Sequence, residues 1–262
     1  MRLSALVAKI HVMRFQDKVV LITGSASGIG LAAAQAFAAE GAKLVLADRQ
    51  AETGEAVAAQ LRQAGHATIF VPTDVADYAA VQHLVATAVQ HFGRLDVAIN
   101  NAGIGGPLAP TAEVALPDWD RVIAVNQTGV FYGMKEQLAV MARQGSGCVI
   151  NIASIAGLRG LPLQLAYTAS KHAVVGMTKA AAGEYARLGI RVNAVCPVFT
   201  HTPLVDQLFA AKEGIDEKFL RTIPLRRFGE VADIVNAITW LADDATSYVT
   251  GLALPIDGGQ TA

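Results

Sequence analysis

The segment KVVLITGSASGIG, residues 18–30, joins a short β-branched run to a glycine-rich turn and the start of an Ala-rich helical stretch. Glycine lets a backbone turn sharply and approach a ligand closely, and the free N–H groups at a helix N-terminus attract an anion. We therefore interpret this turn as a candidate pyrophosphate site formed by Gly24, Ser27, Gly28, Ile29 and Gly30. Because the glycine spacing differs from the common G-x-G-x-x-G fingerprint, a simple turn is the alternative.

Short apolar runs alternate with helical stretches along the rest of the chain. This order is typical of βα units around a parallel sheet, whose strands are covered on both faces and apolar throughout. We predict strands at residues 18–22, 43–47, 68–71, 95–99, 148–152, 191–195 and 252–255. Helices are predicted at residues 28–40, 51–64, 118–143, 164–188 and 230–242, the third with Asp118 as its N-cap. The predicted fold class is α/β, a single doubly wound Rossmann domain with a parallel sheet of about seven strands.

The domain limits follow from this alternation. Residues 1–14 are expected to form an N-terminal extension, and residues 15–262 one Rossmann-fold domain. The first 12 residues lack the long apolar region and small-residue cleavage site of a signal peptide. The alternation lapses after Pro197, so we predict a short helical insertion at about residues 198–229. Such an insertion is typical of a lid over a cleft, and a surface excursion with a packing role only is the alternative.

The composition argues against several classes of protein. Of 262 residues, 53% are hydrophobic and 16% are charged, and 21 basic against 22 acidic residues give a net charge of −1. We expect no binding to nucleic acid or to a membrane, because no apolar run reaches the roughly 18 residues that span a bilayer. Cys148 and Cys196 lie in apolar runs, and buried free thiols suit a reducing compartment, so a cytoplasmic protein is predicted. The expected partner is a small molecule.

Acidic side chains follow the second and third predicted strands. Asp48 ends the second strand about 20 residues after the glycine turn, where a dinucleotide fold places a carboxylate on the ribose hydroxyls. That carboxylate would repel the extra phosphate of NADP, so NAD is the predicted cofactor, although the adjacent Arg49 could turn inward. Asp74 and Val75 follow the third strand at the predicted adenine position. Either aspartate alone would be an ordinary strand-end or turn residue.

The fourth predicted strand ends in Asn100-Asn101-Ala102-Gly103, small residues whose amides can tie neighbouring strand ends together. Ligands of open α/β sheets bind at the carboxyl ends of the strands. We therefore add Asn101, Ala102 and Gly103 to the cofactor residues. Three features at successive strand ends favour a dinucleotide site over a set of unrelated turns.

Candidate catalytic residues lie in the second half of the chain. Tyr167 and Lys171 are four residues apart in a predicted helix and share one face. A nearby ammonium favours the phenolate and lowers the pKa of a tyrosine from about 10, which suits it to acid/base chemistry. A Tyr–Lys pair at this spacing is common by chance. The prediction of a catalytic site therefore also depends on Ser154 after the fifth strand and Asn126 in the long helix. No metal site is predicted.

These motifs closely resemble those of the short-chain dehydrogenase/reductase family. The matching positions are Thr23-Gly24-x-x-x-Gly28-Ile29-Gly30, Asn100-Asn101-Ala102-Gly103, Asn126, Ser154, Tyr167-x-x-x-Lys171 and Asp257-Gly258-Gly259, and the match runs from Phe15 to Gly259. The resemblance implies an NAD-dependent alcohol dehydrogenase or ketoreductase, in which hydride passes between a substrate carbon and the nicotinamide. It also implies a homotetramer, and the apolar last strand would suit a subunit contact.

The resemblance assigns roles to four residues. Tyr167 exchanges a proton with the substrate oxygen, and Ser154 hydrogen-bonds that oxygen. Lys171 lowers the pKa of Tyr167 and holds the nicotinamide ribose, so Tyr167 and Lys171 count as both catalytic and cofactor residues. Asn126 supports a water that links Lys171 to solvent.

The segment after the sixth strand departs from the family pattern. The family has a glycine where this chain has Val198, and a side chain there narrows the region over the nicotinamide amide. His201 is interpreted as a loop residue, because a catalytic tyrosine is already in place. By resemblance, the cofactor contacts in this segment are Pro197, Val198, Thr200 and Thr202.

The predicted substrate pocket is almost entirely apolar. A phosphorylated or highly hydroxylated substrate would leave polar groups unpaired there, so we predict a hydrophobic secondary alcohol or its ketone, including cyclic and aromatic ones. Arg159 and Gln164 are the polar exceptions, which either bind a distal polar group or face water. The expected lining residues are Ile104, Gly105, Gly106, Pro107, Ile155, Ala156, Leu161, Leu163, Phe199, Leu204, Leu208 and Phe209.

Two other functions are alternatives to an alcohol dehydrogenase. A 3-oxoacyl thioester (acyl-carrier-protein) reductase typically prefers NADPH and needs a basic surface for its carrier protein, and Asp48 argues against it. A non-catalytic nucleotide-binding protein would keep the fold without the chemistry. The presence of Ser154, Tyr167 and Lys171 argues against that reading.

Overall fold

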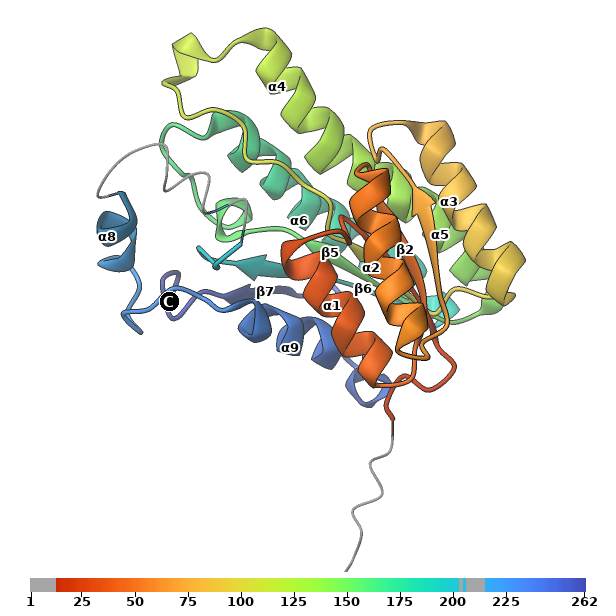
Figure 1. The fold of residues 1–262 in the computed structure, drawn as a ribbon. Helices are drawn as coiled ribbons and strands as arrows, with labels where there is room; N and C mark the ends of the chain where they lie inside the picture. Colours follow the sequence, from red (N-terminus) through yellow and green to blue (C-terminus); the bar gives the residue numbers. More distant parts are fainter. Residues whose placement is uncertain (1–12, 203–204, 206–214) are drawn as a thin grey trace, which may run out of the picture.

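A parallel sheet of seven strands forms the centre of the protein, in the order β3-β2-β1-β4-β5-β6-β7 (Figure 1). The computed structural model describes residues 13–202, 205 and 215–262. All strand pairs are parallel, so the carboxyl ends of all strands lie at one edge. The predicted fold class is confirmed, and the strands are β1 (Val19–Thr23), β2 (Lys43–Asp48), β3 (Thr68–Pro72), β4 (Val97–Asn100), β5 (Gly147–Ile152), β6 (Ile190–Pro197) and β7 (Ala253–Ile256).

Helices cover both faces of the sheet. Apolar side chains of α1, α2 and α9 pack on one face with Val20 and Ile22 of β1, and those of α3, α5 and α6 pack on the other with Val19 and Leu21. Successive residues of β1 are thus buried on opposite faces, which explains why the strand is apolar at every position. The helices are α1 (Gly28–Ala39), α2 (Ala51–Gln63), α3 (Tyr78–Phe92), α4 (Leu116–Ile123), α5 (Gly129–Gln144), α6 (Leu165–Tyr185), α8 (Ile215–Leu220) and α9 (Val231–Ala242).

The prediction of one helix at residues 118–143 is wrong in two respects. The helix begins earlier, at Leu116, because Pro117 fits the first turn of a helix, and Asp118 therefore lies inside α4 instead of capping it. A π-helical turn, Ala124–Thr128, then separates α4 from α5. Such a turn adds a residue without ending the helix, so the apolar pattern on either side still looks like one helix.

Parts of two predicted segments lie outside the described residues. These are residues 1–12 of the N-terminal extension, and Leu204, Leu208 and Phe209 of the insertion. Within the described part, α8 stands in the insertion, and Thr200 pairs with Gly229 in an isolated parallel bridge.

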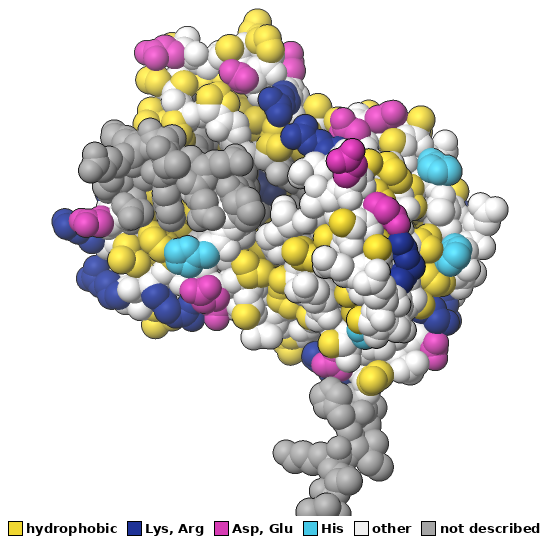
Figure 2. Space-filling model, viewed as in Figure 1, with side chains coloured by type: hydrophobic (Ala, Val, Ile, Leu, Met, Phe, Trp, Pro, Cys, Tyr) yellow, Lys and Arg dark blue, Asp and Glu magenta, His cyan; other side chains and the backbone are white. Residues whose placement is uncertain are grey.

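The structure bears on the expectations for membrane helices, for the two cysteines and for surface charge. No helix in the described part of the chain is long and apolar enough to cross a bilayer. Cys148 and Cys196 are free and buried as predicted, and burial raises the pKa of each thiol to about 11. Both thiols are therefore protonated at neutral pH and poor nucleophiles. Basic and acidic side chains lie interspersed on the face shown in Figure 2.

Candidate active site

The glycine turn after β1 folds tightly onto its surroundings. Gly24 has a positive φ of 66°, and a Cβ there would lie 2.8 Å from Asn101 Nδ2. A Cβ at Gly30 would lie 2.1 Å from the carbonyl oxygen of Gly24. No side chain fits at Gly30 without opening the turn, so glycine there lets the start of α1 pack directly on the backbone of Gly24.

The N-terminus of α1 is suited to an anion. Ser27 is the N-cap residue, but its side chain makes no capping hydrogen bond, and no acidic residue lies in the first turn. The first N–H groups of the helix therefore keep their free donors and their partial positive charge. Together with the bare glycine backbone, this geometry fits the pyrophosphate of a dinucleotide.

Asn101 ties the end of β4 to the glycine turn. Its Nδ2 donates to the carbonyl oxygens of Thr23 at 2.9 Å and Gly24 at 3.1 Å. The Thr23 hydroxyl accepts from the backbone N–H groups of Asn101 at 3.0 Å and Ala102 at 3.1 Å. The expectation that the amides of this motif join neighbouring strand ends is confirmed for Asn101.

Asp48 is held at the end of β2 beside the same turn. It is buried, with 8% of its surface exposed, and its carboxylate accepts from Ala26 N at 3.1 Å and Gln50 N at 3.0 Å. These hydrogen bonds fix a negative charge next to the start of α1. Arg49 is exposed, and Asp74, also exposed, accepts from Ala76 N at 2.9 Å in a local turn.

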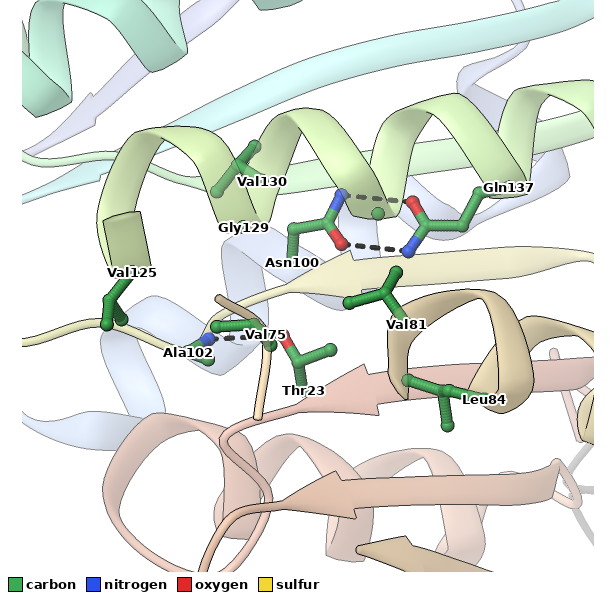
Figure 3. A pocket seen from close by; sticks show the side chains of 11 residues that line it. Thr23, Val75, Val81, Leu84, Asn100, Ala102, Val125, Gly129, Val130 and Gln137 are labelled. Carbon is green, nitrogen blue, oxygen red and sulfur yellow. Dashed lines mark hydrogen bonds between the residues drawn. The ribbon is translucent and has the colours of Figure 1, made fainter. Parts of the chain in front are cut away.

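A buried network of polar side chains lies below this edge; its Asn100–Asn151 link was expected from the amides of the motif after β4, and its Gln137 and Thr178 members were not predicted. Asn100 and Gln137 exchange two hydrogen bonds, of 3.0 and 2.8 Å, beside a small cavity under the strand ends (Figure 3). Asn100 Nδ2 also donates to Asn151 Oδ1 at 2.9 Å, and Asn151 Nδ2 donates to Thr178 Oγ1 at 2.9 Å. The network joins β4, β5, α5 and α6, and buried polar groups satisfied in this way restrict how these elements can shift.

The predicted catalytic residues meet at the carboxyl ends of β5 and β6. Ser154 follows β5, caps the 3₁₀ turn Ile155–Gly157 through Ala156 N at 3.1 Å, and its hydroxyl lies beside the phenol of Tyr167. Tyr167 lies in the first turn of α6, with Lys171 one turn later. Lys171 Nζ is 5.6 Å from the centre of the Tyr167 ring and donates to the carbonyl oxygen of Ile152 at 2.8 Å.

Asn126 lies in the π-helical turn and points into the protein. It is fully buried, its Oδ1 accepts from Ile104 N and its Nδ2 donates to Ile104 O, both at 2.8 Å. A Cβ at Gly103 would lie 3.3 Å from Asn126 Oδ1 and 3.6 Å from Lys171 Nζ. Asn126 and Lys171 therefore flank the same point, which is open because Gly103 has no side chain.

The ionisation of the Tyr–Lys pair differs from the prediction. Desolvation raises the pKa of Tyr167, and the Ser154 hydroxyl lowers it only in part. The predicted lowering of this pKa by Lys171 does not appear in the chain on its own. Lys171 is itself buried, and burial lowers its pKa to about 8.

Side chains of the segment after β6 form hydrogen bonds and packing contacts within the protein. Val198 and Thr200 are buried, and the Thr200 hydroxyl donates to Val198 O at 2.9 Å. Thr202 is partly buried, and its hydroxyl accepts from Val205 N at 3.4 Å. His201 is exposed and packs edge-on against Phe228, which agrees with its interpretation as a loop residue.

Two of the predicted pocket residues pack together. Ile155 and Phe199 join Val198 and Ile223 in one apolar cluster next to Ser154. Leu163 lies near the end of the loop between β5 and α6. Its carbonyl oxygen accepts from Ala109 N at 3.0 Å. This hydrogen bond links the loop after β4 to the loop after β5.

The fold and this site define a dinucleotide-dependent oxidoreductase. A family model described as Enoyl-(Acyl carrier protein) reductase matches residues 24–261. Levodione reductase of Leifsonia aquatica is 43% identical over 256 residues, covering 95% of this chain and 96% of the relative. Cis-4-hydroxycyclohexanecarboxylate dehydrogenase of Sinomonas cyclohexanicum is 42% identical over 248 residues, covering 95% of this chain and 98% of the relative.

Solved structures are similar over the whole domain. The crystal structure of levodione reductase matches with a TM-score of 0.91 at 41% identity, covering 94% of this chain and 98% of that one. NAD+-bound xylitol dehydrogenase matches with a TM-score of 0.88 at 33% identity, covering 94% of this chain and 100% of that one. This chain belongs to the short-chain dehydrogenase/reductase family, whose members use nicotinamide cofactors.

We expect the buried charge of Lys171 to make stability depend on pH. Its pKa falls from an ordinary 10.5 to about 8 on folding, so between these values the unfolded chain binds more protons than the folded chain. The free energy of unfolding should therefore rise with pH across this window, by ~3 kcal/mol from this group, and the cost of burying the charge is fully present below it. Urea unfolding of wild type and Lys171→Met as a function of pH measures this difference.

The two thiols titrate in both proteins and cancel in that comparison. The wild type should gain stability relative to Lys171→Met as the pH rises from about 8 to 10.5. A difference that stays constant with pH would contradict the lowered pKa.

Proposed function

We propose that this protein is an NAD-dependent dehydrogenase of hydrophobic secondary alcohols, with cyclic alcohols and their ketones as preferred substrates. The observation that carries the proposal is the meeting of Ser154, Tyr167 and Lys171 at the sheet edge that also holds the glycine turn. The apolar cluster beside Ser154 supports a hydrophobic substrate. The relative named for cis-4-hydroxycyclohexanecarboxylate supports a ring alcohol.

The residues of the site divide the proton chemistry among them. Tyr167 gives a proton to the substrate oxygen in reduction and takes it in oxidation, while the Ser154 hydroxyl orients that oxygen. A phenol kept protonated by desolvation is suited to the first of these steps. Lys171, with a pKa near neutrality, exchanges protons readily, and Asn126 across the open space at Gly103 supports a water path to solvent. Bound NAD supplies the hydride acceptor.

The proposed cofactor site follows the sheet edge. The glycine turn and α1 hold the pyrophosphate, and Asp48 accepts from the adenosine ribose hydroxyls. Its fixed negative charge supports NAD over NADP, since no basic residue occurs between Ser25 and Ser27 to offset it. The remaining proposed contacts are Arg49, Asp74, Val75, Asn101, Ala102, Gly103, Tyr167, Lys171, Pro197, Val198, Thr200 and Thr202.

Removal of the Tyr167 hydroxyl tests the catalytic assignment. Tyr167→Phe should lower turnover of a ring alcohol by roughly 10² to 10⁴, because positioned acid/base catalysis is worth about that much. NADH binding, followed by fluorescence, should remain. Tyr185→Phe, at the far end of the same helix, is the matched control and should keep wild-type activity. Near-normal turnover by Tyr167→Phe would rule out the assigned role.

The cofactor preference is tested by a panel of cyclic and linear alcohols and ketones with NAD and NADP, following nicotinamide absorbance. Wild type should prefer NAD. Asp48→Asn removes the charge at nearly constant shape, so the ratio of kcat/KM for NADP over NAD should rise on the order of tenfold. Glu52→Gln, an exposed acid at the start of α2, should leave the ratio unchanged. A wild-type preference for NADP would overturn the role of Asp48.

An acyl-carrier-protein thioester is the second candidate substrate, because the matching family model is described by that carrier. Asp48 and the mixed charges of Figure 2 argue against it, since such a reductase prefers NADPH and docks a carrier protein on a basic surface. Faster turnover of acyl thioesters than of ring alcohols in the same panel would favour it.

We place the protein in the cytoplasm, which its reduced, buried thiols support. Recovery of the protein outside the cytoplasmic fraction after cell fractionation would contradict this location.

We further propose that the chain forms a homotetramer. Large apolar side chains remain exposed on two separate regions, with Leu116 and Phe131 on α4 and α5, and Trp240 and Tyr248 near β7. β7 lies at the open edge of the sheet and is only partly covered. Two such surfaces suit the two interfaces of a dihedral tetramer.

Light scattering coupled to size-exclusion chromatography tests the tetramer. Trp240→Glu places a charge in one of the two proposed interfaces and should yield dimers. Leu188→Glu, at an exposed leucine in the 3₁₀ turn that follows α6, is the control and should remain tetrameric. A monomeric wild type would exclude the proposal.

A further inference from the structure

Arg159 is the only charged residue between Ser154 and Tyr167. The two ends of this segment lie side by side, because the Ser154 hydroxyl is next to the Tyr167 phenol. The segment therefore leaves the active site and returns to it, and it forms one wall of the site. Its other side chains are mostly apolar, including Leu158, Leu161 and Leu163.

The backbone that carries Arg159 is fixed at both ends. Arg159 N donates to Ile155 O at 3.0 Å, continuing the turn that Ser154 caps. At the far end, Leu163 has a positive φ of 66°, a conformation that is unfavourable for a leucine. The hydrogen bond from Ala109 N to Leu163 O helps to hold it there. A strained residue that is held in this way is typical of a preorganised functional loop.

The guanidinium of Arg159 has no hydrogen-bond or ion-pair partner among the described residues. Its Nε is buried and has no hydrogen bond, and within the described residues the side chain forms no ion pair. The residue as a whole is partly exposed, so other parts of it remain accessible. An arginine with a buried, unsatisfied donor is poorly solvated, and it gains most from a ligand that accepts two parallel hydrogen bonds.

We propose that Arg159 binds a carboxylate carried by the substrate, at the end of the ring opposite the reacting oxygen. This inference rests on the proposed function and names a substrate class within it, ring alcohols or ketones with an anionic substituent. Arg159 comes five residues after Ser154, just beyond the 3₁₀ turn Ile155–Gly157, on the segment that begins and ends at the active site. A substrate ring held against the leucines of this segment would place its reacting oxygen near Ser154 and its carboxylate near the arginine.

The test compares 4-hydroxycyclohexanecarboxylate with its methyl ester, which has the same ring and alcohol without the charge. Wild type should show the higher kcat/KM on the acid. Arg159→Leu should lower kcat/KM for the acid by roughly 10- to 100-fold and leave the ester almost unchanged. Arg159→Lys keeps the charge without the planar fork and should lie between the two. Arg143→Leu, an exposed arginine at the end of α5, should alter neither substrate.

A binding measurement separates this inference from the proposed function. Cyclohexanecarboxylate has no alcohol to oxidise, and calorimetry should show that it binds the NADH-loaded wild type about 10-fold or more tightly than Arg159→Leu. Equal binding, or equal losses on acid and ester, would show that Arg159 is a structural or solvent-facing cation. Absence of turnover with every ring alcohol would instead overturn the proposed function, while the calorimetric result would still decide the role of Arg159.

Discussion

The Asn101 side chain holds the turn after β1 in the shape on which the proposed dinucleotide site depends. Its amide donates to the carbonyl oxygens of Thr23 and Gly24, and the close packing of Gly24 against Gly30 leaves no room for a Cβ. β1 and β4 are neighbours because the strand order reverses there, which creates the crevice where open α/β sheets bind ligands. The start of α1 and the end of β4 therefore behave as one rigid unit.

The buried network below that edge extends this unit to the catalytic half. Asn100 connects the end of β4 to Gln137 on α5 and to Asn151 on β5, and Asn151 connects to Thr178 on α6. β5 carries the Ile152 carbonyl that receives Lys171, and α6 carries Lys171 itself. Shifting either element would leave buried amides unpaired, which costs more than the hydrogen bonds contribute in place. The network thus restrains the spacing between the glycine turn and the Tyr167–Lys171 pair.

Two cations with contrasting surroundings characterise the substrate half of the site. Lys171 is buried, and desolvation lowers its pKa to about 8, although its Nζ donates to the backbone carbonyl of Ile152. Arg159 cannot lose its proton, and its buried Nε remains without a partner. These surroundings support the proposed roles, proton exchange for Lys171 and recognition of an anion for Arg159.

The sequence by itself determined the sheet, its α/β order and the approximate positions of the glycine turn, Asp48 and the Tyr167–Lys171 pair, because these depend on local periodicity, turn chemistry and spacing along the chain. Only the tertiary structure decided the rest. The π-helical turn at Asn126 and the start of α4 before Asp118 are hidden in a continuous apolar pattern. The partners of Gln137, the pKa of Lys171 and the unpaired Nε of Arg159 depend on groups far away in sequence, whose burial and distance no local pattern records.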